Sequence, residues 1–319
     1  MSIYAHLKKI IGTAACILWA TALCAQHDAQ VTQYMFGQVL LNPACAGNSE
    51  LMNTMFMQRS QYMGFEGAPS TWSLGIDAPF TLLDAKHGAA VVITGDKVGN
   101  FDNMSFSLGY AYRHPLSNGA TLAVGLSLGG LSYKLASASA WSSYATDPLV
   151  PTREESASTG FDMNLGALYD SKFYYVSFAC RHLNQPGVLT MESGSKAMTV
   201  SSTFYLSGGY RWQTSNEKLE VDPSALLSFT AITKPQLALG ANVFYAKRYW
   251  GGLFYRIGDA LGAMGGLTIR EGLRLGVAYE HSLSELTGTN GGNLEFFISY
   301  AFELKMAKRE KKYKSIRFL

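Results

Sequence analysis

The feature that most constrains this chain is a strict two-residue alternation, seen most clearly in NMSFSLGYAYR, residues 103–113. Large apolar or aromatic side chains such as Met104, Phe106 and Leu108 alternate there with small or polar ones. Successive side chains of a β-strand point to opposite faces, so this segment is a strand with one apolar and one polar face. A helix with the same pattern would scatter both kinds of side chain around its circumference.

The alternation recurs along the chain and predicts an antiparallel barrel of about fourteen strands. We expect these strands at residues 51–63, 71–78, 88–94, 103–113, 121–135, 159–169, 173–182, 200–212, 220–230, 234–245, 249–257, 261–270, 273–281 and 293–302. Strands of roughly 9–11 residues are long enough to cross a bilayer at a tilt.

The composition indicates a surface that does not face water throughout. Apolar residues make up 48% of the 319 residues, whereas charged residues make up only 15%, against about 25% in a typical soluble domain. No apolar run of about 18 residues follows Gln26, so we expect no transmembrane helix. A β-barrel in an outer membrane meets these conditions, because closure of the barrel satisfies the backbone hydrogen bonds of every strand.

The first 25 residues have the pattern of an export signal. Two lysines precede an apolar run that ends at Leu23, and a plausible cleavage site lies before Gln26. The alternatives are an uncleaved membrane anchor and a lipoprotein attached through Cys24, before which Leu23 stands where a small residue is preferred.

The connections between the expected strands alternate in length. The longest, at 136–158, 183–199 and 282–292, are all odd-numbered, whereas 170–172 and 246–248 are among the short even-numbered turns. Outer-membrane barrels have short periplasmic turns and longer outer loops. The pattern therefore supports an even number of strands and a first strand that begins at the periplasmic end.

The sequence thus predicts an all-β protein whose main part is a transmembrane antiparallel β-barrel. We expect a signal peptide at 1–25, an irregular periplasmic or lumenal segment at 26–50, the outer-membrane barrel at 51–302 and a basic periplasmic tail at 303–319. Five of the basic residues of the tail are Lys308, Arg309, Lys311, Lys312 and Lys314. The tail is either a solvated chain end or a contact for an acidic periplasmic partner.

Ionisable residues fall on the expected inner face of the barrel. They are Asp77, Arg113, Asp162, Arg181, Arg211, Asp222, Arg270, Arg274, Glu280 and Glu295. Such groups would be costly toward lipid. Inside the barrel they can pair and fill the lumen; a selective pore lining is the alternative.

The sequence carries no recognisable catalytic or metal-binding pattern. A G-x-S-x-G match at 125–129 lies inside an alternating strand, whereas the nucleophile of that motif needs a sharp strand-to-helix turn. The five histidines after residue 25 lack the spacing of metal ligands, and the two cysteines after residue 25, Cys45 and Cys180, do not make a disulfide framework. We therefore expect no enzymatic activity, no cofactor, no bound metal and no nucleic-acid partner.

Several short motifs stand in the first part of the chain. They are Gln33-Tyr34-Met35-Phe36, Leu41-Asn42-Pro43-Ala44 with Ala46-Gly47, Arg59, and Gly64-Phe65-Glu66-Gly67-Ala68-Pro69 with Thr71. In these residues the chain resembles the PorP/SprF family, the outer-membrane barrels of the type IX secretion system of Bacteroidetes. The alternating pattern extends this compatibility over the rest of the sequence.

The resemblance implies a multi-pass protein of the cell outer membrane that serves protein secretion. Such proteins support export or surface attachment of large proteins with a C-terminal signal domain, including adhesins used in gliding motility. The implied partners are outer-membrane lipid, secretion components of the periplasm and outer membrane, and the secreted client. A diffusion barrel for hydrophobic or small solutes, similar to fatty-acid transporters, is the alternative, and an adhesion or structural barrel is a third class.

We expect the partner-binding residues among those that carry the resemblance. The candidates are Gln33, Tyr34, Phe36, Asn42, Pro43, Gly47, Arg59, Gly64, Phe65, Gly67 and Pro69. In this hypothesis Arg59 and the 64–70 hairpin form a site at one rim, with Phe65 as an exposed anchor, and the segment 26–50 docks inside or below the barrel. The alternative is that these residues only build a stable hairpin.

Overall fold

The computed structural model describes residues 28–136, 155–190, 196–231, 233–270, 272–283, 288 and 290–303. The expected signal peptide and the basic residues of the expected tail lie outside this part of the chain. Its elements are α2 (Gln38–Leu41), η1 (Pro43–Cys45), β1 (Met52–Ser60), β2 (Ser70–Leu82), β3 (Ala85–Val98), β4 (Phe101–Pro115), β5 (Thr121–Ala136), β6 (Glu155–Asp170), β7 (Tyr174–Arg181), β8 (Gly187–Thr190), β9 (Lys196–Thr199), β10 (Thr203–Tyr210), β11 (Trp212–Gln213), β12 (Leu219–Thr230), β13 (Gln236–Tyr245), β14 (Tyr249–Arg256), β15 (Ala260–Arg270), β16 (Leu273–Ser282) and β17 (Asn293–Phe302).

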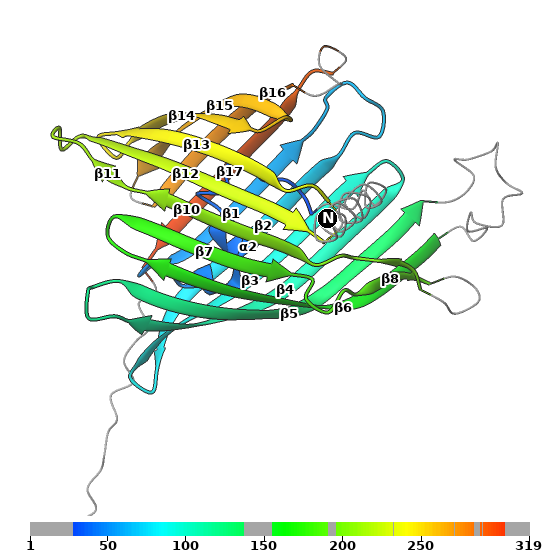
Figure 1. Cartoon of the computed structure of the whole chain (residues 1–319), viewed down its shortest axis with the longest axis horizontal. Helices are drawn as coiled ribbons and strands as arrows, with labels where there is room; N and C mark the ends of the chain where they lie inside the picture. The colour runs from blue at the N-terminus through cyan, green and yellow to red at the C-terminus, as the bar shows by residue number, and fades with distance from the viewer. Residues whose placement is uncertain are drawn as a thin grey trace, which may run out of the picture.

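Fourteen antiparallel wall strands form a closed barrel (Figure 1). Sequential strands pair with one another, β7 pairs with β10, β10 pairs with β12, and β17 pairs with β1 to close the ring. The short β11 continues the line of β10 along β12 and belongs to the same wall strand. The predicted antiparallel barrel is therefore confirmed. The hairpin of β8 and β9, which the alternation did not predict, forms a separate two-stranded sheet.

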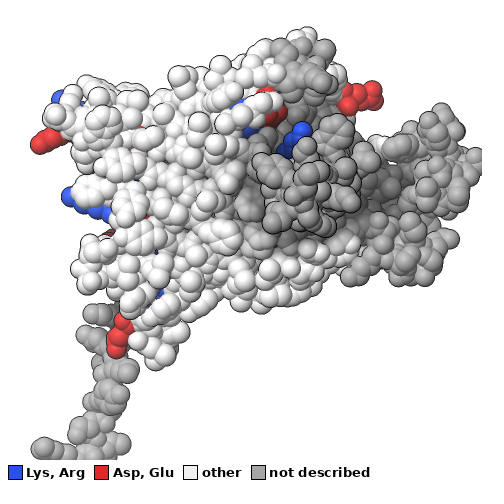
Figure 2. Space-filling view, viewed as in Figure 1, with Lys and Arg blue, Asp and Glu red and all other residues white. Residues whose placement is uncertain are grey.

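The alternation of the sequence appears directly in the two faces of the wall. Leu108 and Tyr110 of β4 and Phe296 and Ile298 of β17 point outward, whereas Glu295 and Phe297 of β17 point into the barrel and are buried. On the face shown in Figure 2, charged side chains gather toward the ends of the barrel and the middle of the wall is almost free of them. Such a band suits contact with lipid acyl chains.

The two ends of the barrel carry connections of different length. One end has the short turns at 83–84, 116–120 and 246–248, and the other has the longer connections at 182–202 and 283–292. By the usual asymmetry of these barrels the first end faces the periplasm and the second faces outward. Strand β1 begins at the periplasmic end. In the described part of the chain, no helix is long and apolar enough to cross a membrane.

Residues 28–48, which we call the plug, run through the lumen from the outer end to the periplasmic end (Figure 1). Asp28 contacts Arg181 at the outer end of β7, and Asn48 contacts Asp170 at the periplasmic end of β6. Two short helices, α2 and η1, lie between these contacts. The chain then leaves the lumen and enters β1.

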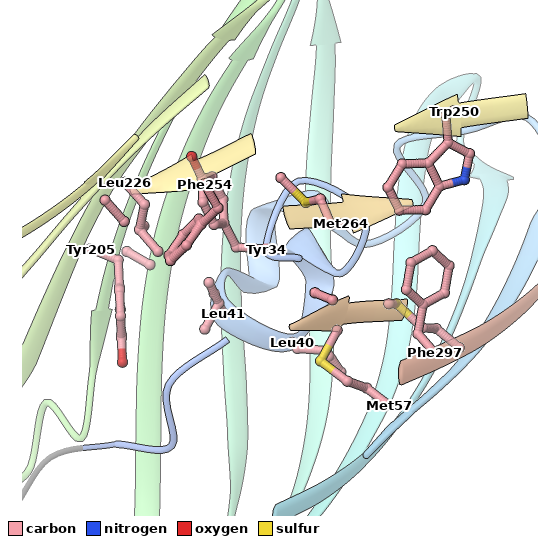
Figure 3. Close-up of a cluster of buried hydrophobic side chains, with 14 residues drawn as sticks. Tyr34, Leu40, Leu41, Met57, Tyr205, Leu226, Trp250, Phe254, Met264 and Phe297 are labelled. Carbon is pink, nitrogen blue, oxygen red and sulfur yellow. The ribbon is translucent and has the colours of Figure 1, made fainter. Parts of the chain in front are cut away.

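A hydrophobic core fills the space between the plug and the inner wall (Figure 3). Tyr34, Leu40 and Leu41 of the plug pack against inward-facing residues such as Phe254 and Phe297. These aromatic side chains occupy inward positions of the strands, where an open channel would carry polar groups. The barrel wall and the plug therefore share one core.

Candidate functional site

The plug residues that carry the family resemblance converge inside the barrel. Gln33, Tyr34 and Asn42 are 0%, 1% and 2% exposed, and Pro43 is also buried. These buried side chains therefore contact the wall and hold the plug in the lumen. Their contacts divide into an outer group, a middle group and a periplasmic group.

In the outer group, Arg59 lies between two carboxylates. Its Nη2 donates to Glu280 at 2.8 Å and its Nη1 donates to Glu295 at 3.3 Å. The backbone N–H groups of Thr32 and Gln33 each donate to Glu295 at 2.8 Å. The Thr32 hydroxyl bridges Arg59 and Glu280, and Arg256 donates to Glu280 from the other side at 3.3 Å. Because these charges are buried, each depends on the others for compensation.

A second outer cluster holds Asp28, the first described residue. The carboxylate of Asp28 lies 2.8 Å from Nε2 of His182 and 3.2 Å from Arg181, and Nδ1 of His182 lies 2.9 Å from Asp162. Burial alone would lower the pKa of His182, but the charge of Asp28 and the two hydrogen bonds to carboxylates raise it to about 9. Burial alone would raise the pKa of Asp28, but Arg181 and His182 hold it well below its usual range. The cluster is thus an ionic attachment of the chain at the outer end.

In the middle group, Asn42 joins the plug to strands β6 and β7. Its Nδ2 donates to the Ser177 hydroxyl at 2.7 Å and to the Phe178 carbonyl at 3.0 Å. Its Oδ1 accepts from the N–H of Ala44 at 2.8 Å and caps η1, which begins at Pro43. Asn42 and Pro43 therefore fix both the start of η1 and its place on the wall.

Glycines in the wall allow this close approach. A Cβ added to Gly88 would collide with the Ala46 carbonyl, and a Cβ added to Gly125 would collide with the backbone of Ala44. A Cβ on Gly166 would collide with the side chain of Asn42. The plug backbone thus lies directly on a wall face without side chains at these positions.

In the periplasmic group, Gly47 turns the chain toward β1. It has a φ of +61°, and its N–H donates to Asp77 at 2.9 Å. The guanidinium of Arg113 donates to the carbonyls of Ala46 at 3.2 Å and Ala44 at 3.3 Å. The inward ionisable residues Asp77 and Arg113 therefore bind the plug rather than line an open pore.

Phe36 occupies the periplasmic side of the hydrophobic core. Its ring centroid lies 4.5 Å from that of Trp250, 5.1 Å from that of Phe297 and 6.2 Å from that of Phe244. The guanidinium of Arg274 stands over the Phe36 ring, 5.3 Å from its centroid.

The outer turn at 61–69 is the one group of candidate residues at the surface. Gly64 and Gly67 have φ of +100° and +72°, and Phe65 is 42% exposed. The N–H of Gln61 donates to the Pro69 carbonyl at 2.9 Å and closes the turn. The expected rim site of Arg59 and this turn does not form, because the side chain of Arg59 turns into the lumen and is only 2% exposed.

Of the other expected features, the structure describes the two cysteines but not the basic tail. The tail residues Lys308, Arg309, Lys311, Lys312 and Lys314 lie outside it. Cys45 and Cys180 are free and buried, and in the described ranges no group of three His, Cys, Asp or Glu residues is placed to hold a metal ion. Sequence reasoning missed the pairing of Asp28 with His182, since two-residue periodicity says nothing about an irregular segment.

The family is decided by comparison of the whole sequence. The family model described as type IX secretion system membrane protein PorP/SprF matches residues 23–300. This chain belongs to the PorP/SprF family. The PorP/SprF protein described here is therefore a secretion-related, multi-pass barrel of the outer membrane. Its family is one of membrane barrels and not a known enzyme family.

Solved structures with a similar fold are barrels of distant sequence. The toluene transporter TbuX of Ralstonia pickettii is 11% identical, with a TM-score of 0.51, and the match covers 86% of this chain and 94% of TbuX. The P. putida toluene transporter TodX is 10% identical, with a TM-score of 0.49, and the match covers 83% of this chain and 94% of TodX. The Acinetobacter baumannii outer membrane protein Omp33 is 8% identical, with a TM-score of 0.47, and the match covers 81% of this chain and 100% of Omp33. No curated protein sequence matches the chain. At these identities the likeness to TbuX speaks for the fold alone.

Proposed function

We propose that this PorP/SprF barrel supports the export or surface attachment of large proteins with a C-terminal signal domain, adhesins among them. Family membership supplies the secretion role. The observation that carries the finer proposal is the filled lumen, in which the plug contacts strands on every side from Asp28 to Asn48. A client polypeptide therefore does not pass through this barrel, which acts through the surfaces at its two ends.

The outer turn at 61–69 is the surface we assign to a protein partner. Phe65 presents an exposed aromatic side chain on a turn that backbone hydrogen bonds hold closed, including one from the Gly99 N–H to the Gly67 carbonyl at 2.8 Å. Rigid exposed aromatic residues are typical anchors of protein interfaces. The periplasmic turns and the basic tail are the corresponding proposed contacts for secretion components in the periplasm.

The test replaces residues 64–69 by a short Gly-Ser turn and measures both barrel insertion and client export. We expect insertion to be kept and export or surface attachment to fall. A finer pair of variants is F65S and, as the matched control, L183S, since Leu183 is 42% exposed, as Phe65 is, but lies in a different outer connection, 182–202. Normal export by the turn replacement, with normal insertion, would contradict the assignment of this surface.

A diffusion barrel for hydrophobic or small solutes is the second candidate. One observation favours it, namely the likeness of fold to TbuX, described as a toluene transporter. The plug speaks against it, because the cavities at the outer end have volumes of only about 30 Å³ and 60 Å³. Uptake of a small hydrophobic solute by cells with and without the barrel distinguishes the two candidates, since only a diffusion barrel changes the uptake rate.

A further inference from the structure

A cavity of about 320 Å³ lies between the plug and the periplasmic part of the wall. Met35, Phe36 and Gln38 line it from the plug side, and the ends of β10, β12, β13 and β16 that face the periplasm line it from the wall side. Its volume falls at the lower end of the range of about 300–1,000 Å³ for ligand pockets. The buried ion pairs at the outer end of the plug lie outside it.

Polar atoms without partners concentrate around this cavity. Asn242 is 0% exposed, and neither its amide nitrogen nor its amide oxygen makes a hydrogen bond. The Tyr175 hydroxyl and Oδ1 of Asp222, which also line the cavity, are buried and unpaired. These three residues supply four of the eight unpaired buried side-chain atoms found among the described residues. Buried polar groups in folded proteins almost always have partners, so this concentration calls for one.

Arg274 adds a cationic group to the same cavity. Its half-buried guanidinium stacks over the Phe36 ring and makes no hydrogen bond or ion pair with the residues that the structure describes. Three other inward arginines, Arg59, Arg113 and Arg256, donate to carboxylates or carbonyls of the plug or wall. A planar guanidinium with free N–H groups is suited to bind a carboxylate or a carbonyl oxygen.

We propose that this cavity binds a short peptide segment presented from the periplasm. A peptide group carries one donor and one acceptor, which matches the unpaired acceptor and donor of Asn242. The carbonyl or terminal carboxylate of the segment accepts from Arg274, and its N–H groups donate to Asp222. The rings of Phe36 and Phe244 contact an apolar side chain of the segment. The inference deepens the proposed function, because it names a place where the barrel holds a polypeptide partner.

The direct test measures binding to the purified full-length barrel in detergent by calorimetry. The probes are the tripeptide Ala-Phe-Ala with free ends, the same tripeptide with an amidated C-terminus, and 3-phenylpropionate, which has the ring and the carboxylate but no peptide group. We expect saturable binding of the free tripeptide, weaker binding of the amidated one, and the weakest binding of 3-phenylpropionate. Equal or tighter binding of 3-phenylpropionate would overturn the proposal in favour of a carboxylic-acid site.

Two variants locate the binding. R274Q removes the charged donor and N242D removes the amide donor at nearly constant volume, and each is expected to weaken binding of the tripeptide about 10- to 100-fold. R248Q is the matched control, because Arg248 is exposed on the neighbouring turn 246–248 and does not line the cavity. Thermal unfolding of each variant checks that the barrel is intact.

Two further results would overturn the inference: no saturable binding by the wild-type barrel, or equal affinity for wild type, R274Q and N242D. In the first case the unpaired atoms are hydrated and hold no peptide. Neither result bears on export, which the replacement of the outer turn measures separately, so failure of this site and failure of the proposed function are distinguishable.

Discussion

The outer and periplasmic halves of the lumen hold the same plug in different ways. In the outer half, Arg59, Glu280 and Glu295 form a buried network with the plug backbone, and the adjoining cavities measure about 30 Å³ and 60 Å³. In the periplasmic half, two cavities of about 320 Å³ and 390 Å³ flank the plug. The outer half is therefore closely packed and charge-compensated, whereas the periplasmic half leaves room beside the plug.

This difference indicates which side of the membrane the plug closes. Loss of one partner of a buried ion pair leaves an uncompensated charge and strongly destabilises the fold. The charged residues of the outer attachment therefore depend on one another. Cavities lined by polar side chains can instead accept water or a ligand without displacing the plug. The barrel thus presents a closely packed outer end and an accessible periplasmic end.

The largest expected effect comes from removing the plug altogether. Deletion of residues 28–48 removes the groups that fill the lumen, and we expect large, sustained ion conductance in planar bilayers. The full-length barrel should show none, because the outer half leaves no continuous path of comparable width. Replacement of the outer turn 64–69 is the control, since it alters the surface and leaves the plug in place. Stable conductance by the full-length barrel would end the comparison between the two halves.

The next effect compares one arginine from each half. R59M leaves Glu295 buried without a cation and Glu280 with Arg256 alone, and should lower the free energy of unfolding by about 3–5 kcal/mol. R211M breaks the pair of Arg211 with Asp170 at the periplasmic end, where the two side chains are 36% and 20% exposed, and should cost at most about 1 kcal/mol. Urea unfolding in detergent measures both. Equal losses would show that the two ends hold the plug alike.

A smaller effect tests the close contact between plug and wall. G125A places a methyl group where the backbone of Ala44 lies, so the plug must shift, at a cost of about 1–3 kcal/mol. G130A on the same strand is the control, because a Cβ there meets its nearest atom at 3.7 Å. The melting temperature should fall for G125A and stay within error for G130A. A loss of the same size in both would mean that strand flexibility, and not the plug, is affected.

The wall of this protein could be predicted from the sequence and the contents of its lumen could not. Alternation identified all fourteen wall strands because lipid on one side and a filled interior on the other impose a two-residue period on every strand. It also placed Asp77, Arg113, Glu280 and Glu295 on the inner face. The plug has no period to detect, so its path from Asp28 to Asn48 depends on contacts between residues far apart in the chain.

Arg59 shows the same limit at a single residue. Its position in the motif series suggested a rim site with the neighbouring turn, because the two are close in sequence. In the structure the alternation of β1 turns its side chain inward, and its partners Glu280 and Glu295 lie more than two hundred residues away. The alternation of β1 therefore predicts that Arg59 faces inward, but it does not predict which residues Arg59 contacts.

The smallest expected effect is a dependence on pH confined to the outer half. His182 has a pKa raised to about 9, so its attraction for Asp28 is complete below its ordinary value of 6.5 and is lost as the pH rises through about 9. The pKa of Asp28 is lowered, so its contribution is present above its ordinary value of 3.8 and is lost as the pH falls below it. The outer attachment of the plug should therefore be strongest between about pH 4 and pH 6.5 and weaken toward pH 10.

Hydrogen exchange measured peptide by peptide tests this dependence within one molecule. Protection of residues 28–33, corrected for the intrinsic effect of pH, should fall between pH 7 and pH 10, whereas protection of residues 44–48 should not, because His182 contacts the plug only at its outer end. H182Q keeps a side chain that can hydrogen-bond but cannot titrate, so it should abolish the fall. If both plug segments lost protection together, the plug would move as one rigid body, and the outer cluster would be a latch for the whole lumen instead of a local attachment.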